Sequence, residues 1–125
     1  MYTVGIEREF FAQHYLVGAD FGAENQPHTH AYRVEFRLSG DGLDRHGFLA
    51  DIDAMSAALD EVLDGVHDRT LNDLPAFEGL NPSIEHLARI LCCALRPRFC
   101  DGRLRRITVT IRESPHAWAA YTEPL

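Results

Sequence analysis

The chain is organised around residues 10–32, whose sequence is FFAQHYLVGADFGAENQPHTHAY. The middle of this stretch, Val17–Pro27, contains two glycines, an asparagine and a proline, which is typical of a loop. The residues on either side alternate between apolar and polar, which is typical of β-strands. The stretch therefore predicts two neighbouring strands joined by a loop that returns the chain beside itself.

Three histidines lie at the facing ends of these strands. Residues two apart on a strand point to the same face, so His28 and His30 project together if His28–Phe36 is a strand. Antiparallel pairing with the preceding run brings His14 to the other two. Three neutral nitrogen ligands with an open fourth position are typical of a catalytic zinc site. A His-x-His pair alone is more often exposed and without a role, but His14 and the nearby acidic residue Glu24 favour a metal centre here.

Further along the chain, the apolar spacing predicts two helices followed by two more strands. The predicted strands are Tyr2–Tyr15, Ala31–Leu38, Arg105–Arg112 and His116–Thr122, and the predicted helices are Asp53–Val66 and a segment from about Ser83 to Pro97. This order predicts an α+β layer, a four-stranded antiparallel sheet with two helices on one face. Four strands are too few to close a barrel and leave two open edges, which oligomerisation is a ready way to cover.

Composition restricts the classes of function. The 125 residues predict a single domain, residues 1–125, and the net charge of −7 argues against a nucleic-acid partner. The absence of lysine excludes Schiff-base chemistry. Three clustered cysteines, Cys92, Cys93 and Cys100, are typical of reduced thiols in a cytosolic protein. No signal peptide or membrane-spanning run is apparent, so we expect a cytoplasmic protein without a membrane partner.

Taken together, the motifs resemble those of the 6-pyruvoyltetrahydropterin synthase and 6-carboxytetrahydropterin synthase family. They follow the family's order over nearly the whole chain, and together they are specific although each alone is weak. They comprise Phe10-x-Ala12-x-His14, His28-Thr29-His30, Gly47 with Asp51, Leu71-Asn72, Asn81-Pro82-Ser83-x-Glu85, and Glu113-Ser114 followed by Ala119 and Tyr121.

The resemblance implies a tunnel fold, in which the open sheets of several subunits join into a barrel, and a homohexamer built as a dimer of trimers. It implies that His14, His28 and His30 bind zinc and that a small-molecule pterin lies at the subunit interface. Glu113 would anchor the pterin ring, because a carboxylate accepts two parallel hydrogen bonds from the ring's amide and amino groups.

Two departures from the family pattern concern proton transfer. Glu24 stands where the family usually has its catalytic cysteine, and the family's Asp-His pair is transposed here as His67-Asp68. A glutamate at this position resembles a subgroup that cleaves the side chain to leave 6-hydroxymethyldihydropterin, an aldolase-like reaction. We therefore predict Glu24, His67 and Asp68 as the catalytic residues, with Glu24 as general base.

Three hypotheses follow. The first is a zinc-dependent lyase or synthase acting on the side chain of 7,8-dihydroneopterin triphosphate or a related dihydropterin. The second is a pterin-binding protein that keeps the metal and the ring pocket but has lost proton transfer. The third is a structural metal site in an oligomeric scaffold. An open fourth coordination position separates the third hypothesis from the others, and turnover separates the first from the second.

Overall fold

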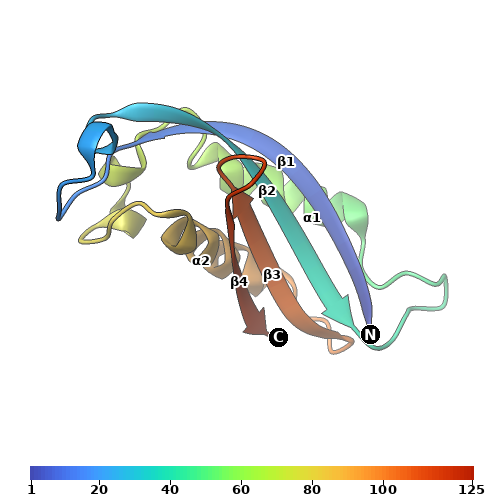
Figure 1. The fold of residues 1–125 in the computed structure, drawn as a ribbon. Coiled ribbons are helices and arrows are strands. Elements are labelled where there is room, and N and C mark those ends of the chain that lie inside the picture. Colours follow the sequence, from blue (N-terminus) through green and yellow to red (C-terminus); the bar gives the residue numbers. More distant parts are fainter.

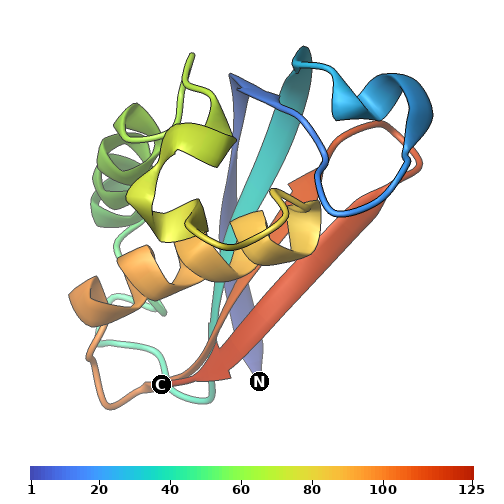
Figure 2. The same cartoon turned by 90° about the vertical axis from the view of Figure 1, so that its left-hand side faces the viewer.

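The computed structural model describes all 125 residues as a curved sheet with helices on one face (Figure 1). The sheet has the order β1-β2-β3-β4, and every neighbouring pair is antiparallel. Its strands are β1 (Tyr2–His14), β2 (His28–Gly40), β3 (Leu104–Arg112) and β4 (Trp118–Pro124). Helices α1 (Ile52–Asp64) and α2 (Ile84–Leu95) lie between β2 and β3 in the chain and cover the same face (Figure 2). The predicted α+β layer is confirmed.

The core lies between the sheet and the helices, and it follows from the alternation along the strands. In β2, Tyr32, Val34, Phe36 and Leu38 are fully buried, and the residues between them face away from the helices. The same core includes Leu87, Leu91 and Leu95 of α2, which recur at helical spacing. Burying such a side chain contributes about 1.5–3 kcal/mol, so this one layer fixes which face of the sheet the helices cover.

Each helix begins at a side-chain cap. The carboxylate of Asp51 accepts hydrogen bonds from the backbone N–H groups of Asp53 and Ala54 at the start of α1. The hydroxyl of Ser83 accepts one from the backbone N–H of His86 at the start of α2. These caps satisfy N–H groups that the first turn of a helix leaves without partners. Neither helix has the length and apolar character needed to cross a membrane.

The other face of the sheet is polar. Arg33 forms an ion pair with Glu7, and Arg37 forms one with Glu35. Threonine side chains continue this face across β3 and β4, where Thr108 and Thr122 share a hydrogen bond of 2.8 Å. The face that the helices leave uncovered is therefore suited to contact with water.

Two strands differ from their predicted bounds by more than one residue: β2 extends from His28 to Gly40, beyond the predicted Ala31–Leu38, and the last strand is shifted toward the C-terminus. The last strand begins at Trp118, two residues later than expected, because the hydroxyl of Ser114 accepts hydrogen bonds from the N–H groups of His116 and Ala117. These bonds hold His116 and Ala117 in the turn.

Candidate metal centre and ligand cavity

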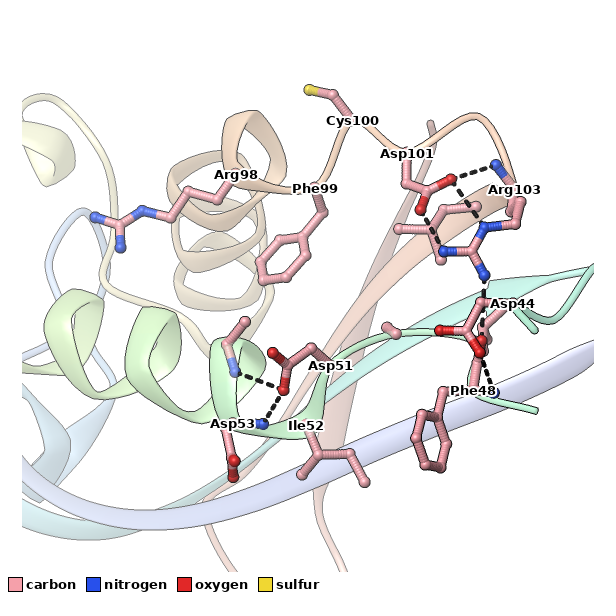
Figure 3. A pocket seen from close by; sticks show the side chains of 14 residues that line it. Asp44, Phe48, Asp51, Ile52, Asp53, Arg98, Phe99, Cys100, Asp101 and Arg103 are labelled. Atoms are coloured by element: carbon pink, nitrogen blue, oxygen red, sulfur yellow. Dashed lines mark hydrogen bonds and ion pairs between the residues drawn. The ribbon is translucent and has the colours of Figure 1, made fainter. Parts of the chain in front are cut away.

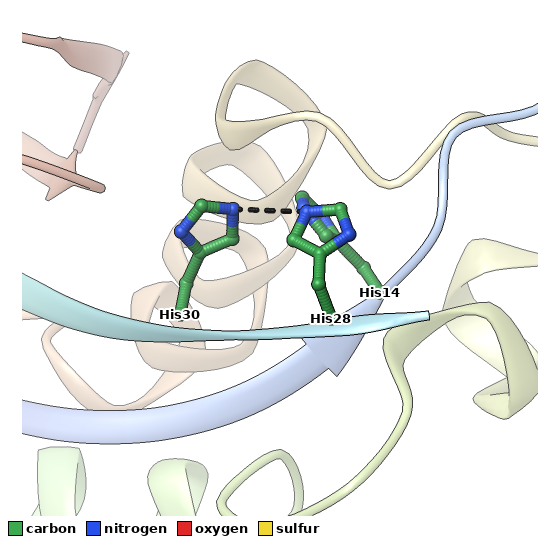
Figure 4. Close-up of side chains that lie close together, drawn as sticks. All are labelled: His14, His28 and His30. Carbon is green, nitrogen blue, oxygen red and sulfur yellow. Dashed lines mark hydrogen bonds between the residues drawn. The ribbon is translucent and has the colours of Figure 1, made fainter. Parts of the chain in front are cut away.

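The register of β1 and β2 brings the three predicted histidines together (Figure 4). His14 lies directly opposite His28, and Ala12 lies opposite His30, so all three imidazoles project from the face that the helices cover. The ring centroid of His14 lies 4.6 Å from that of His28 and 4.9 Å from that of His30. One ring nitrogen from each histidine lies within 4.8 Å of the other two.

Backbone carbonyls select the tautomer of two of these rings. Nδ1 of His14 lies 2.8 Å from the carbonyl oxygen of Pro82, and Nδ1 of His28 lies 2.8 Å from that of Gln26. A carbonyl only accepts, so each Nδ1 must carry the proton and donate it. The Nε2 atoms are then left as lone-pair donors, which is how metal-binding histidines are usually fixed.

His14 is the buried member of the three, with 4% of its surface exposed. Burial lowers the pKa of His14, and the hydrogen bond with Pro82 only partly opposes this shift. The nearby His30 and His28 rings lower the pKa further. His14 is therefore held in the neutral form, which is the form that binds a metal ion.

The donor set fits a zinc ion. The Nε2 atoms of His28 and His30 lie 3.1 Å apart. Tetrahedral zinc with nitrogen ligands at 2.0–2.1 Å places neighbouring nitrogens about 3.3 Å apart. The separation is close to this value, and Nε2 of His28, whose proton lies on Nδ1, offers its lone pair toward Nε2 of His30.

A cavity of about 430 Å³ adjoins the imidazoles of His14 and His30. Two of the predicted site residues, Glu24 and Glu113, line it with them. The remaining lining residues are Leu16, Ser83, Ile84, Glu85, His116, Ala117 and Trp118. Two of the three predicted metal ligands, the predicted base and the predicted ring anchor thus border one space.

Glu24 reaches this cavity because its loop is tied to the end of β1. It lies in a short 3-10 helix, Gly22–Asn25, whose Glu24 carbonyl accepts a hydrogen bond of 2.9 Å from the N–H of Leu16. The side-chain amide of Asn25 donates to the carbonyl of Leu16 at 2.9 Å. The negative charge of Glu24 is close enough to His14 to act on its pKa, in the raising direction.

Glu113 directly follows β3 and sits at the start of the β3–β4 turn, where its N–H donates to the carbonyl of Ala117. Its charge also acts on Tyr32, whose pKa burial raises well above the usual range. The Tyr32 hydroxyl in turn lies 3.3 Å from Nδ1 of His14. Tyr32 therefore lies between the predicted ring anchor, Glu113, and the predicted metal ligand, His14, and interacts with both.

His67 and Asp68 do not line this cavity. They follow α1 along the edge of β1, where the Nδ1 of His67 accepts a hydrogen bond from the N–H of Phe11. The Nε2 of His67 lies 3.2 Å from a carboxylate oxygen of Asp68, so the transposed pair still forms a carboxylate–imidazole contact. Both side chains are exposed, at 46% and 71%. A role in proton transfer at this cavity would therefore require contact with a second subunit.

Several groups that support or border the site were not predicted as site residues, although Asn72, Asn81 and Pro82 belong to motifs that the chain shares with the family. The side chains of Asn72 and Asn81 accept hydrogen bonds from the N–H groups of Tyr15 and Val17, and so hold the chain that follows His14. The carbonyl of Pro82 has no residue-specific signature at all. His116 and Trp118 border the cavity because of the turn before β4, which the alternation pattern placed two residues too early.

A second cavity, of about 710 Å³, lies at the opposite end of the sheet (Figure 3). No histidine lines it. Arg103 at its rim is paired with Asp101, and Arg98 is paired with Glu61. Its ring-bearing residues are Phe48, which is 62% exposed, and Phe99. We find no arrangement of acid, base and metal-binding groups there.

A layered α+β domain with three imidazoles converging beside an acidic cavity defines the class: a tunnel-fold domain with a candidate metal centre. The family model for 6-pyruvoyl tetrahydropterin synthase matches residues 3–124, and the chain belongs to that family. Membership supports a pterin-related lyase function. A comparison with curated protein sequences finds no significant match.

Solved structures of the same family are similar over their full length. The 6-pyruvoyl tetrahydropterin synthase of Caenorhabditis elegans shares 27% identity at a TM-score of 0.82, with 98% of this chain and 97% of that chain covered. The Plasmodium falciparum enzyme shares 16% identity at 0.79, covering 99% and 98%. A Plasmodium vivax form with a catalytic glutamate replaced by alanine shares 15% at 0.79, with both chains fully covered. The two Plasmodium structures support the fold alone.

Proposed function

We propose that the protein is a zinc-dependent lyase acting on the side chain of 7,8-dihydroneopterin triphosphate or a related dihydropterin. The observation that carries the proposal is the meeting of three imidazoles, two of which, those of His14 and His30, line one cavity with Glu24 and Glu113, in a chain of this family. His14, His28 and His30 would hold the ion. When bound there, zinc supplies Lewis acidity, which stabilises negative charge as it develops on the ligand.

Glu113 and Glu24 have different tasks in this proposal. Glu113 accepts hydrogen bonds from the amide and amino groups at the edge of the pterin ring and so fixes its orientation. Glu24 is the general base in place of the family's usual cysteine. It is a carboxylate on the metal side of the cavity, as the charge interaction with His14 indicates. The Plasmodium vivax relative also has a glutamate as a catalytic residue, which supports a carboxylate in this role.

For a side chain with hydroxyls on its first two carbons, the aldolase-like step is balanced as follows. Glu24 takes the proton of the second hydroxyl, that oxygen becomes an aldehyde, and the bond between the two carbons breaks. The electron pair passes to the carbon that stays on the ring, which is then protonated to give the hydroxymethyl product. No lysine is needed, in agreement with the composition.

The direct test is to incubate the zinc-loaded protein with dihydroneopterin triphosphate and, separately, with dihydroneopterin, and to identify the products by mass. Side-chain cleavage yields 6-hydroxymethyldihydropterin and a two-carbon aldehyde, whereas synthase chemistry eliminates the triphosphate. Binding without turnover would favour the second candidate, a pterin-binding protein. That candidate is supported by the position of His67 and Asp68 outside the cavity of their own chain.

A further inference from the structure

Tyr32 carries a buried hydroxyl whose own proton has no acceptor. The side chain is fully buried, and the only hydrogen-bond contact of its hydroxyl is with Nδ1 of His14, at 3.3 Å. That nitrogen carries a proton, which it donates to the carbonyl of Pro82, so the hydroxyl cannot donate to it. Burial raises the pKa of Tyr32, and the charge of Glu113 raises it further, so the hydroxyl keeps its proton. A buried donor without an acceptor is costly, so an acceptor is expected beside this hydroxyl.

Glu113 offers the complementary group at the neighbouring position of the sheet. The last cross-strand pair of β2 and β3 is Arg33 with Arg112. Continued by one step, this antiparallel register places Tyr32 opposite Glu113, on the face that the helices cover. Residues opposite each other on one face have Cβ atoms about 5 Å apart. The Glu113 carboxylate takes part in no hydrogen bond or ion pair in the structure, and only its backbone N–H does. A protonated donor without an acceptor therefore lies beside a carboxylate without a donor.

We infer that Tyr32 is the positioning residue of the pterin anchor: in the ligand-bound protein, its hydroxyl donates to one oxygen of Glu113. A carboxylate has about four lone-pair sites, so it can accept this bond together with the two from the ring's amide and amino groups. The bond is charge-assisted and fixes the direction in which the carboxylate faces the ring. The chain already contains such a pair elsewhere, since the hydroxyl of Tyr121 donates to Glu123 at 2.8 Å. This inference rests on the proposed pterin function.

The test measures the binding of unsubstituted pterin, which carries the ring but no side chain for the metal site, to the full-length, zinc-loaded protein by calorimetry. Tyr32→Phe should weaken pterin binding about tenfold, because one hydrogen bond to a charged group is lost. In a Glu113→Gln background the same substitution should change the affinity by less than about twofold, because Tyr32 acts through Glu113. Tyr121→Phe removes the other tyrosine–glutamate bond and is the matched control, which should bind pterin as the parent does. Zinc content should be the same in every variant.

Lumazine supplies a second readout, because it carries an oxo group where pterin carries the amino group. A correctly oriented carboxylate prefers pterin, so Tyr32→Phe should lower the ratio of the pterin affinity to the lumazine affinity. A general loosening of the core would weaken the binding of both ligands alike and leave this ratio unchanged.

The outcomes separate this inference from the proposed function. The inference is overturned, and the lyase proposal stands, if Tyr32→Phe binds pterin as well as the parent does. The same holds if Tyr32→Phe causes equal losses with and without Glu113→Gln, or if the ratio of the two affinities does not change. Loss of zinc from Tyr32→Phe would mean that the hydroxyl acts through His14, which also overturns the inference. If the zinc-loaded parent binds no pterin at all, both are wrong.

Discussion

Two backbone carbonyls decide which nitrogens the candidate metal centre presents. By accepting from Nδ1 of His14 and His28, the carbonyls of Pro82 and Gln26 leave both Nε2 atoms with a free lone pair, and Nε2 of His28 lies 3.1 Å from Nε2 of His30. An imidazole whose ring orientation is already fixed, with its unprotonated nitrogen toward the metal position, loses little side-chain conformational entropy when an ion binds.

Loss of two of these donors should abolish zinc binding. The double variant His28→Ala, His30→Ala leaves a single imidazole, and we expect it to contain no zinc after dialysis against a weak chelator. Metal analysis of the purified protein checks this. His46→Ala, in an exposed loop away from the cavity, should keep one zinc per chain. Full occupancy in the double variant would rule out the assigned ligands.

Glu24 can be tested without disturbing binding. Glu24→Gln keeps the size of the side chain and removes the base, so turnover of dihydropterin should fall by at least a hundredfold while zinc and pterin still bind. Glu24→Cys recreates the family's usual residue and should shift the product toward synthase chemistry. Product analysis by mass distinguishes the two. Glu24 has no catalytic role if Glu24→Gln turns over substrate as fast as the parent.

Glu113 should govern ring affinity and leave the metal untouched. Glu113→Gln replaces an acceptor by a donor that faces the ring's own N–H groups, and losing a charged partner at such a site costs about 2–5 kcal/mol. Pterin affinity measured by calorimetry should therefore fall at least tenfold at constant zinc content. Glu78→Gln, an exposed carboxylate outside the cavity, is the control. An unchanged affinity would place the ring pocket elsewhere.

The start of α2 links helix stability to the metal site. Ser83 caps the helix, and the preceding residue, Pro82, offers the carbonyl that orients His14. Asp51 caps α1 in the same way but far from the histidines. The two caps therefore form a matched pair for separating a stability effect from an effect on the metal.

Removing either cap should lower the free energy of unfolding by about 1 kcal/mol. Only Ser83→Ala should also weaken zinc binding, by a few-fold, because the Pro82 carbonyl loses its fixed position. Denaturant unfolding and competitive zinc titration measure the two effects separately. Equal zinc affinities in Ser83→Ala and Asp51→Ala would mean that the Pro82 carbonyl does not depend on the cap.

The strands and helices were predictable because their buried apolar side chains recur at the spacing of a strand or a helix. Alternation in residues 31–38 identifies β2, and pairing it with β1 places His14 opposite His28 as expected. Strand ends were less predictable, since the hydroxyl of Ser114 delays β4 until Trp118. The orienting carbonyls were not predictable, because a backbone oxygen is the same in every residue.

The whole molecule has a polar sheet face and unpaired strand edges. Ion pairs such as Arg33–Glu7 cover the face that the helices leave open, so packing two such faces together would bury charges at a high cost. Joining sheets edge to edge leaves the charges in water and satisfies the free backbone groups of β4 and of the first part of β1. This favours an oligomer, and the resemblance to the family implies a hexamer, so sedimentation should give six times the chain mass of 14.1 kDa. A stable monomer at micromolar concentration would contradict this prediction.

Assembly should also decide how His67 and Asp68 reach a site. They lie on the edge of β1, outside the cavity that contains Glu24 of the same chain, so a relay role requires the edge of one subunit to meet the cavity of another. Glu24→Gln and His67→Ala should each be inactive when purified alone. Refolded together in equal amounts, the two variants should recover about a quarter of the parent's activity, because a quarter of randomly assembled sites combine an intact base with an intact relay. Refolding each variant alone and mixing afterwards is the control. No recovery in assemblies of the correct mass would mean that His67 does not act across a subunit contact.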